Sequence, residues 1–220
     1  TLPTLKGLNF DEKDAFVIEP NAGNDSICYW IKDSLVYQMD TLAIQMDYLY
    51  TDSLNQLVPK TDTIYLANKL TRAQKEKLAK KEAEEKEKER KKKEKKGEKI
   101  EPEPTPFLKM NVDAPSSFDI NKNIVLTFEE PVVRMDTSAI RVHVKEDTLW
   151  GKTPFLWVAD SVIPRQYEIL AGWEPEKEYQ LQIDSAAITG LYGLHTNKVE
   201  QTLKVKKLDE YGTLLLNLPG

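Results

Sequence analysis

An Asp followed directly by Ser or Thr recurs along the chain, and this pair carries the most evident chemistry in the sequence. Nine of the 15 Asp residues precede Ser or Thr, although those two types occupy only 24 of 220 positions. In eight pairs an aliphatic residue comes next, and the hydroxyl residues are Ser26, Ser34, Thr41, Ser53, Thr63, Thr148, Ser161 and Ser185. The ninth, Thr137, is followed by Ser138. The repeat has three interpretations: a metal ligand set, turn punctuation, or an acceptor site for a modifying enzyme.

The spacing of these pairs argues against a metal site. Calcium loops gather several oxygens from alternate positions of one short segment, whereas these Asp residues are spread singly along the chain. Turn punctuation fits most copies, because short Asp and Ser/Thr side chains bond nearby backbone amides. However, Asp precedes Ser or Thr more often than turn formation alone requires. We therefore predict no metal and expect turns, with acceptor sites as an open second role.

Signatures of catalysis are absent from the sequence. It contains no phosphate-binding Gly-rich loop with Lys-Ser/Thr, no His-Glu-x-x-His and no Gly-x-Ser-x-Gly. The two histidines, His143 and His195, are 52 residues apart, and a structural role is expected for both. A hydrolase that uses two carboxylates stays open as a third possibility, since 36 acidic residues supply many pairs. We expect no catalytic residues, no cofactor and no enzyme activity.

Four tryptophans are candidates for a sugar-stacking surface, because an aromatic face packs well against a pyranose. Trp30 and Trp157 lie within strongly apolar runs, which predicts core positions for both. Trp150 and Trp173 lie beside Gly or close to Pro, and remain candidates for ligand stacking. They define the alternative function, a carbohydrate-binding module.

The charge distribution is uneven along the chain. Residues 71–105 carry 14 Lys or Arg against 10 Asp or Glu, and the rest carries 17 against 26. Phosphate contact needs clustered positive charge, so we expect no nucleic acid partner for the acidic body. Cys28 is the only cysteine, so no disulfide can form within the chain. No apolar run reaches the roughly 18 residues that a membrane span requires.

The first 70 residues predict an all-β unit. Short apolar or β-branched runs occupy residues 15–20, 26–32, 41–50 and 62–67. Four or five strands are few for a sandwich of about seven, so this unit is an incomplete Ig-like domain or another all-β unit.

Residues 71–106 predict a Lys/Glu-rich helical or disordered linker. Thr71 and Gln74 have the spacing of a capping box, and five Glu-to-Lys pairs stand four apart. No apolar stripe follows, so residues 72–96 should be a solvent-exposed helix or tether with no coiled-coil partner. The Pro-rich residues 101–106 then favour extended backbone.

Residues 107–207 predict an Ig-like antiparallel β-sandwich. Seven strand-like runs separated by turn residues match such a sandwich in number and spacing; they are 107–112, 123–128, 140–144, 154–160, 166–171, 178–184 and 201–208. Residues 208–220 are expected to start a further strand or domain. The predicted fold class is mainly β.

Two segments, 120–144 and 173–197, resemble the bacterial Ig-like domain of the surface-layer-protein type. The matching positions are Leu126, Thr127, Phe128, Pro131, Val132, Tyr179, Leu181, Ile183, Ile188, Tyr192 and Gly193. The resemblance implies the C-terminal half of a multidomain exported lipoprotein, located in the periplasm or at the outer membrane. It implies a structural or interaction role, an envelope protein or glycan as partner, and membrane attachment only through an N-terminal lipid anchor outside this chain. Asp-Ser/Thr-aliphatic is also similar to the acceptor motif of a periplasmic O-glycosylation system, which makes the eight hydroxyls candidate O-glycosylation sites.

Overall fold

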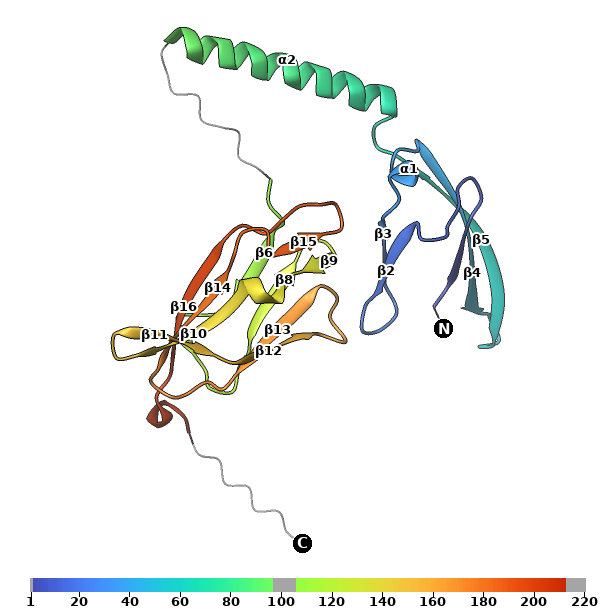
Figure 1. Ribbon diagram of the computed structural model, residues 1–220. Helices are drawn as coiled ribbons and strands as arrows, with labels where there is room; N and C mark the ends of the chain where they lie inside the picture. Colours follow the sequence, from blue (N-terminus) through green and yellow to red (C-terminus); the bar gives the residue numbers. More distant parts are fainter. Residues whose placement is uncertain (1, 97–105, 213–220) are drawn as a thin grey trace. The chain divides into compact units, whose positions relative to one another are not determined.

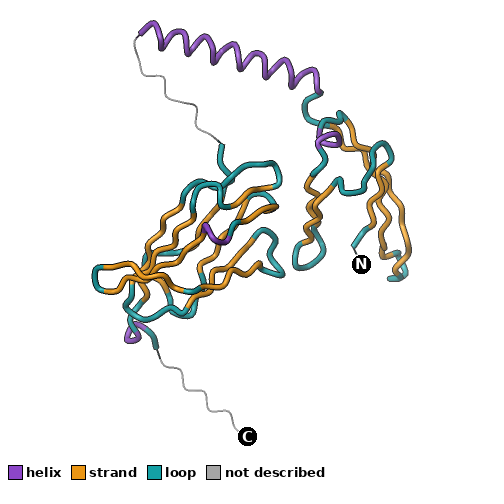
Figure 2. Tube along the Cα trace, viewed as in Figure 1, coloured by secondary structure: helices purple, strands orange, loops and turns teal. Residues whose placement is uncertain are grey.

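The chain divides into two compact units, Thr1–Thr105 and Pro106–Gly220. The computed structural model describes residues 2–96 and 106–212, and strands dominate both units (Figure 1; Figure 2). Nearly all strand pairs are antiparallel. The predicted mainly β class is confirmed.

The second unit is a β-sandwich (Figure 1). Its five-stranded sheet has the order β11-β10-β14-β16-β7, and its four-stranded sheet has the order β12-β13-β8-β6. The first sheet contains β7 (Ser117–Phe118), β10 (Ile140–Glu146), β11 (Leu149–Thr153), β14 (Glu178–Ile183) and β16 (Val199–Val205). The second contains β6 (Met110–Asp113), β8 (Ile124–Phe128), β12 (Phe155–Ala159) and β13 (Gln166–Ala171). A separate pair joins β9 (Val132–Met135) and β15 (Ile188–Gly190).

This strand order is that of an immunoglobulin-type sandwich. The seven predicted strands become β6, β8, β10, β12, β13, β14 and β16. In chain order they distribute between the sheets as strands A, B, D and E in one and C, F and G in the other, the Ig arrangement. The short strands β7, β9, β11 and β15 were not predicted, since two to five residues give little periodicity.

Alternation along the strands builds the core of the sandwich. Every second residue of β14 is buried, namely Tyr179, Leu181 and Ile183, and β8 follows the same pattern. Each fully buried aliphatic or aromatic side chain of this size stabilises the fold by about 1.5–3 kcal/mol. Inward-facing side chains of both sheets therefore hold the sandwich together.

A buried tyrosine fixes the connection between β13 and β14. The Tyr179 hydroxyl accepts a hydrogen bond from the Glu174 backbone N–H at 2.8 Å and donates one to the Gly172 carbonyl at 3.2 Å. A Tyr near the start of strand F, bonded to backbone just upstream, is the tyrosine corner of Ig domains. It sets the path of the chain between the two sheets.

The first unit contains a three-stranded sheet, β1-β4-β5, and the β2-β3 hairpin. Its elements are β1 (Thr4–Gly7), β2 (Phe16–Pro20), β3 (Ile27–Ile31), α1 (Ser34–Tyr37), β4 (Thr41–Thr51) and β5 (Leu57–Ala67). The four predicted runs all form strands, whereas β1 and α1 were not predicted. Asp33 caps α1 by accepting from the Leu35 N–H at 2.7 Å. Four buried residues form a small core: Ala15, Val36, Leu42 and Ile44.

Helix α2 (Arg72–Lys96) follows β5 and begins where the capping box predicts. The Thr71 N–H donates to Gln74 Oε1 at 3.0 Å, and the Gln74 N–H donates to Thr71 Oγ1 at 3.4 Å. Glu87 and Lys91 form one of the predicted ion pairs, at 2.6 Å. The described side chains of α2 are exposed except Lys75, which is half-buried beside the Tyr37 ring. Neither helix in the described part of the chain is long and apolar enough to cross a membrane.

Deletion of residues 72–96 should leave the unfolding of the sandwich nearly unchanged. Apart from Lys75, the described side chains of α2 are exposed, and the helix has no apolar stripe to bury. We expect a change in unfolding free energy below about 1 kcal/mol, measured by urea denaturation. A larger loss would show that the helix packs against the sandwich.

Candidate functional site

All eight candidate acceptor residues are exposed. Ser26, Ser34, Thr41, Ser53, Thr63, Thr148, Ser161 and Ser185 each belong to the exposed class. Two of them, Thr148 and Ser53, lie in the turns between β10 and β11 and between β4 and β5. Thr41 is the first residue of β4, and Ser26 directly precedes β3. The hydroxyls do not converge on one site but are distributed over both units.

Hydrogen bonds confirm the turn interpretation for several pairs. The first carboxylate oxygen of Asp52 accepts from the backbone N–H of Leu54 at 2.9 Å, two residues further on. Asp160 accepts in the same way from Val162 at 2.7 Å and also from Ile163 at 2.9 Å. The Ile163 and Val162 amides hold the pKa of the Asp160 carboxyl below its usual range. These are side-chain-to-backbone turns of the expected kind.

One pair differs from the turn interpretation. Thr63 lies in the middle of β5, where Asp62 accepts from the Tyr48 hydroxyl and pairs with the Lys60 ammonium at 3.0 Å. The Asp62 carboxylate thus bonds side chains of the β4-β5 sheet and not the backbone of a turn, so the turn interpretation is wrong for this pair. Ser185 agrees with the turn interpretation, because β14 ends at Ile183 and Ser185 lies in the turn that follows.

The tryptophans separate into one exposed ring and three more buried ones. Trp173 is only 8% exposed, and its ring packs edge-on against Phe118 at 5.2 Å and Tyr179 at 4.9 Å. The expectation that it stacks on a ligand is wrong, because sandwich packing encloses the ring. Trp150 is 40% exposed on β11, with the Lys145 ammonium 5.9 Å from its ring centroid.

The two tryptophans assigned to cores behave differently. Trp157 packs against the sandwich core, with its ring 5.4 Å from the ring of Tyr167. Trp30 is only half-buried, and its indole N–H donates to Glu19 Oε2 at 2.7 Å across the β2-β3 hairpin. The core expectation for Trp30 is wrong, because the first unit has little volume to enclose it.

A buried acid, Glu130, is a polar feature that was not predicted. Glu130 follows β8 and is 6% exposed, and its Oε1 atom is buried and has no hydrogen-bond partner among the described residues. A side chain at Gly190 would overlap that oxygen. Burial raises the pKa of the Glu130 carboxyl, although a hydrogen bond from the Tyr192 backbone opposes the shift. Glu130 has the parity of the buried residues of β8, whereas its exposed neighbour Glu129 does not, so this alternation is the signal that could have indicated the buried acid.

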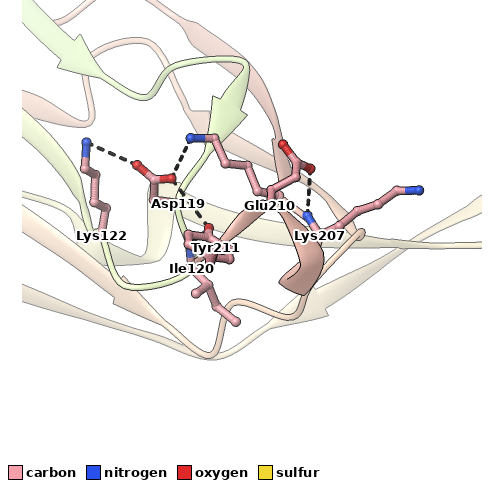
Figure 3. Close-up of polar contacts among 7 residues, drawn as sticks. Asp119, Ile120, Lys122, Lys207, Glu210 and Tyr211 are labelled. Carbon is pink, nitrogen blue, oxygen red and sulfur yellow. Dashed lines mark hydrogen bonds and ion pairs between the residues drawn. The ribbon is translucent and has the colours of Figure 1, made fainter. Parts of the chain in front are cut away.

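A polar cluster ties the chain after β16 to the connection between β7 and β8 (Figure 3). Asp119 accepts from the Lys206 ammonium at 2.7 Å and pairs with Lys122 at 3.3 Å. The Tyr211 hydroxyl accepts from the Ile120 N–H at 2.9 Å. The sandwich contacts therefore extend past the predicted boundary at 207. Residues 208–210 form a 3-10 turn, and residues 213–220, which make up most of the segment expected to start a further strand or domain, lie outside the described residues.

Asp119 should make the stability of the sandwich sensitive to acid. The Lys206 and Lys122 ammonium groups hold the pKa of its carboxyl below its usual range. A carboxyl whose pKa is lower folded than unfolded stabilises the fold when ionised, and that stabilisation is lost as pH falls through the folded pKa. Asp119→Asn should thus be less stable than wild type at neutral pH, with a difference that shrinks below about pH 4.

Urea denaturation at pH 7 and pH 3 measures this difference. Asp113→Asn, which changes an exposed carboxylate of β6, is the matched control. A deficit of Asp119→Asn that is equal at both pH values would contradict the role of the ionised cluster.

The described residues contain no group of three or more His, Cys, Asp or Glu side chains arranged to hold a metal ion. Comparison with models of protein families finds no match, and comparison with curated proteins finds no relative.

Proposed function

We propose that this chain is a non-enzymatic structural or interaction module of the bacterial cell envelope. The observation that carries the proposal is the arrangement of two β units along the chain with a solvent-exposed charged helix between them in sequence. A helix of 25 residues is about 37 Å long. A module of this kind presents surfaces for binding and spaces them, and it transforms no substrate.

The residues that carry the resemblance to surface-layer-type Ig domains support this assignment. Leu126, Phe128, Leu181 and Ile188 are all buried in the sandwich core. Gly193 has a φ of +80°, a conformation that favours glycine. These five matching positions therefore serve packing and a turn, as an Ig sandwich requires.

O-glycosylation of the exposed Asp-Ser/Thr pairs belongs to the same proposal. A transferase needs its acceptor hydroxyl exposed, and all eight candidates meet that requirement. Bulky hydrated glycans near strand ends would shield sheet edges from proteases and from pairing.

Protein isolated from its native cells is expected to be heavier than the same chain made in a cytosol without such a system. Ser53 and Thr148, which stand in turns between paired strands, are the first expected sites. Intact-mass analysis, followed by peptide mapping, measures the difference. Equal masses would show that the Asp-Ser/Thr pairs are not modified and serve only in turns.

Carbohydrate binding through Trp150 is the alternative function. The observation that favours this alternative is the Trp150 ring at the β10-β11 hairpin, which is 40% exposed. Calorimetric titration with envelope polysaccharides tests it: binding that is lost in Trp150→Ala and kept in Trp30→Phe would favour the alternative.

Co-sedimentation with envelope fragments from native cells tests the main proposal. The purified chain should bind saturably, and unlabelled chain should compete with labelled chain. Trp150→Ala should bind equally, which separates a protein or lipid-linked partner from a sugar read by that ring. Absence of saturable binding would overturn the interaction role.

A further inference from the structure

We propose that the free edge of β5 pairs antiparallel with β5 of a second copy of this chain. In the described residues, β5 is an 11-residue strand bonded to a neighbour, β4, on one side only. An unpaired edge presents a row of backbone donors and acceptors. This inference goes beyond the function proposed above and is independent of where the protein works.

Backbone hydrogen bonds at both ends of the β4-β5 ladder show which groups face outward. The Asn68 N–H donates to the Asp40 carbonyl at 2.8 Å, and the Asp52 N–H donates to the Gln56 carbonyl at 2.9 Å. Because the register is continuous between these pairs, even-numbered residues of β5 bond to β4. The odd-numbered residues therefore direct their backbone groups away from the sheet; they are Leu57, Pro59, Thr61, Thr63, Tyr65 and Ala67.

The sequence of β5 is complementary to itself about Thr61. With Thr61 opposite Thr61 of the second copy, Lys60 lies opposite Asp62 of the other chain, and Asp62 opposite Lys60. Val58 then faces Ile64, and Leu57 faces Tyr65. The two charge pairs and the Val58–Ile64 pairs lie on one face of the sheet, and the Leu57–Tyr65 pairs lie on the other; both kinds are favourable cross-strand pairs.

The neighbouring registers are disfavoured by charge. A shifted register must still place odd-numbered residues opposite odd-numbered residues, because only their backbone groups face outward. The nearest such registers move the centre of the pairing from Thr61 by one residue in either direction. One such shift places Asp62 opposite Asp62, and the other places Lys60 opposite Lys60. Like charges directly opposite are destabilising, so the register centred on Thr61 is selected.

The side chains that this pairing would cover are exposed, and several of them are apolar. Leu57 is 66% exposed, Tyr65 71% and Ile64 36%. The side chains of Lys60 and Asp62 are 46% and 43% exposed, so both can reach a second strand. Pro59 lacks an N–H, and its outward position leaves bonding to β4 intact while removing one donor per chain from the new ladder.

Charge reversal in the full-length chain tests the pairing and its register. Wild type should show a concentration-dependent dimer in analytical ultracentrifugation. Lys60→Glu alone and Asp62→Lys alone each place like charges opposite one another twice, and each should weaken dimerisation about tenfold or more. An equimolar mixture of the two variants restores both charge pairs and should form a heterodimer, detected by native mass spectrometry.

Lys6→Glu, a reversal on the exposed side chain of β1, is the control and should dimerise like wild type. Heterodimer formation shows that both variants are folded. A wild type that stays monomeric at all concentrations, single variants that dimerise normally, or a mixture without heterodimers would overturn the proposal.

Discussion

Gly190→Ala is expected to destabilise the sandwich by about 1–3 kcal/mol. The added Cβ would overlap Oε1 of Glu130, whose side chain is 6% exposed and has no solvent to move into. The matched control is Gly172→Ala, because a Cβ at that position meets no atom within 4 Å. Urea denaturation followed by tryptophan fluorescence in a Trp30→Phe background reports on the second unit alone, which contains the other three tryptophans.

A second substitution shows whether Glu130 is the cause. In Glu130→Ala the overlapping carboxylate is absent, so adding Gly190→Ala should have almost no further effect. Such non-additivity is expected of residues in direct contact. Equal losses from Gly190→Ala with and without Glu130 would show that the glycine is needed for another reason.

Tyr179→Phe is expected to lower the unfolding free energy of the sandwich by about 1–3 kcal/mol. The hydroxyl bonds two backbone groups, the Glu174 N–H and the Gly172 carbonyl, on a side chain that is 1% exposed. The same fluorescence-monitored denaturation measures the loss. Tyr65→Phe, on a 71% exposed ring in the first unit, is the control and should leave the sandwich unchanged. An unfolding free energy of Tyr179→Phe equal to that of wild type would mean that water bonds these two backbone groups in place of the hydroxyl.

Periodicity and local capping were readable from the sequence. The apolar runs at 123–128 and 178–184 predicted strands, and they form β8 and β14, in which burial of one face gives a period of two. Thr71 and Gln74 predicted the start of α2 because a capping box is local in sequence.

Features that depend on contacts distant in sequence were not readable. Trp173 and Trp150 have similar neighbours in sequence, yet only the Trp173 ring is enclosed by Phe118 and Tyr179. Glu129 and Glu130 are adjacent, and only the second lies beneath β15, 60 residues further on, at Gly190. The self-complementary edge of β5 also required the ladder with β4, which determines which backbone groups face outward.

Fractionation of the cells that produce the protein tests the proposed envelope role most directly. With an antibody against the sandwich, we expect to find the protein in the periplasmic and outer-membrane fractions, and a cytosolic marker enzyme should be absent from those fractions. Protein confined to the cytosolic fraction would contradict an envelope module, and with it the proposed glycosylation of the exposed Asp-Ser/Thr pairs.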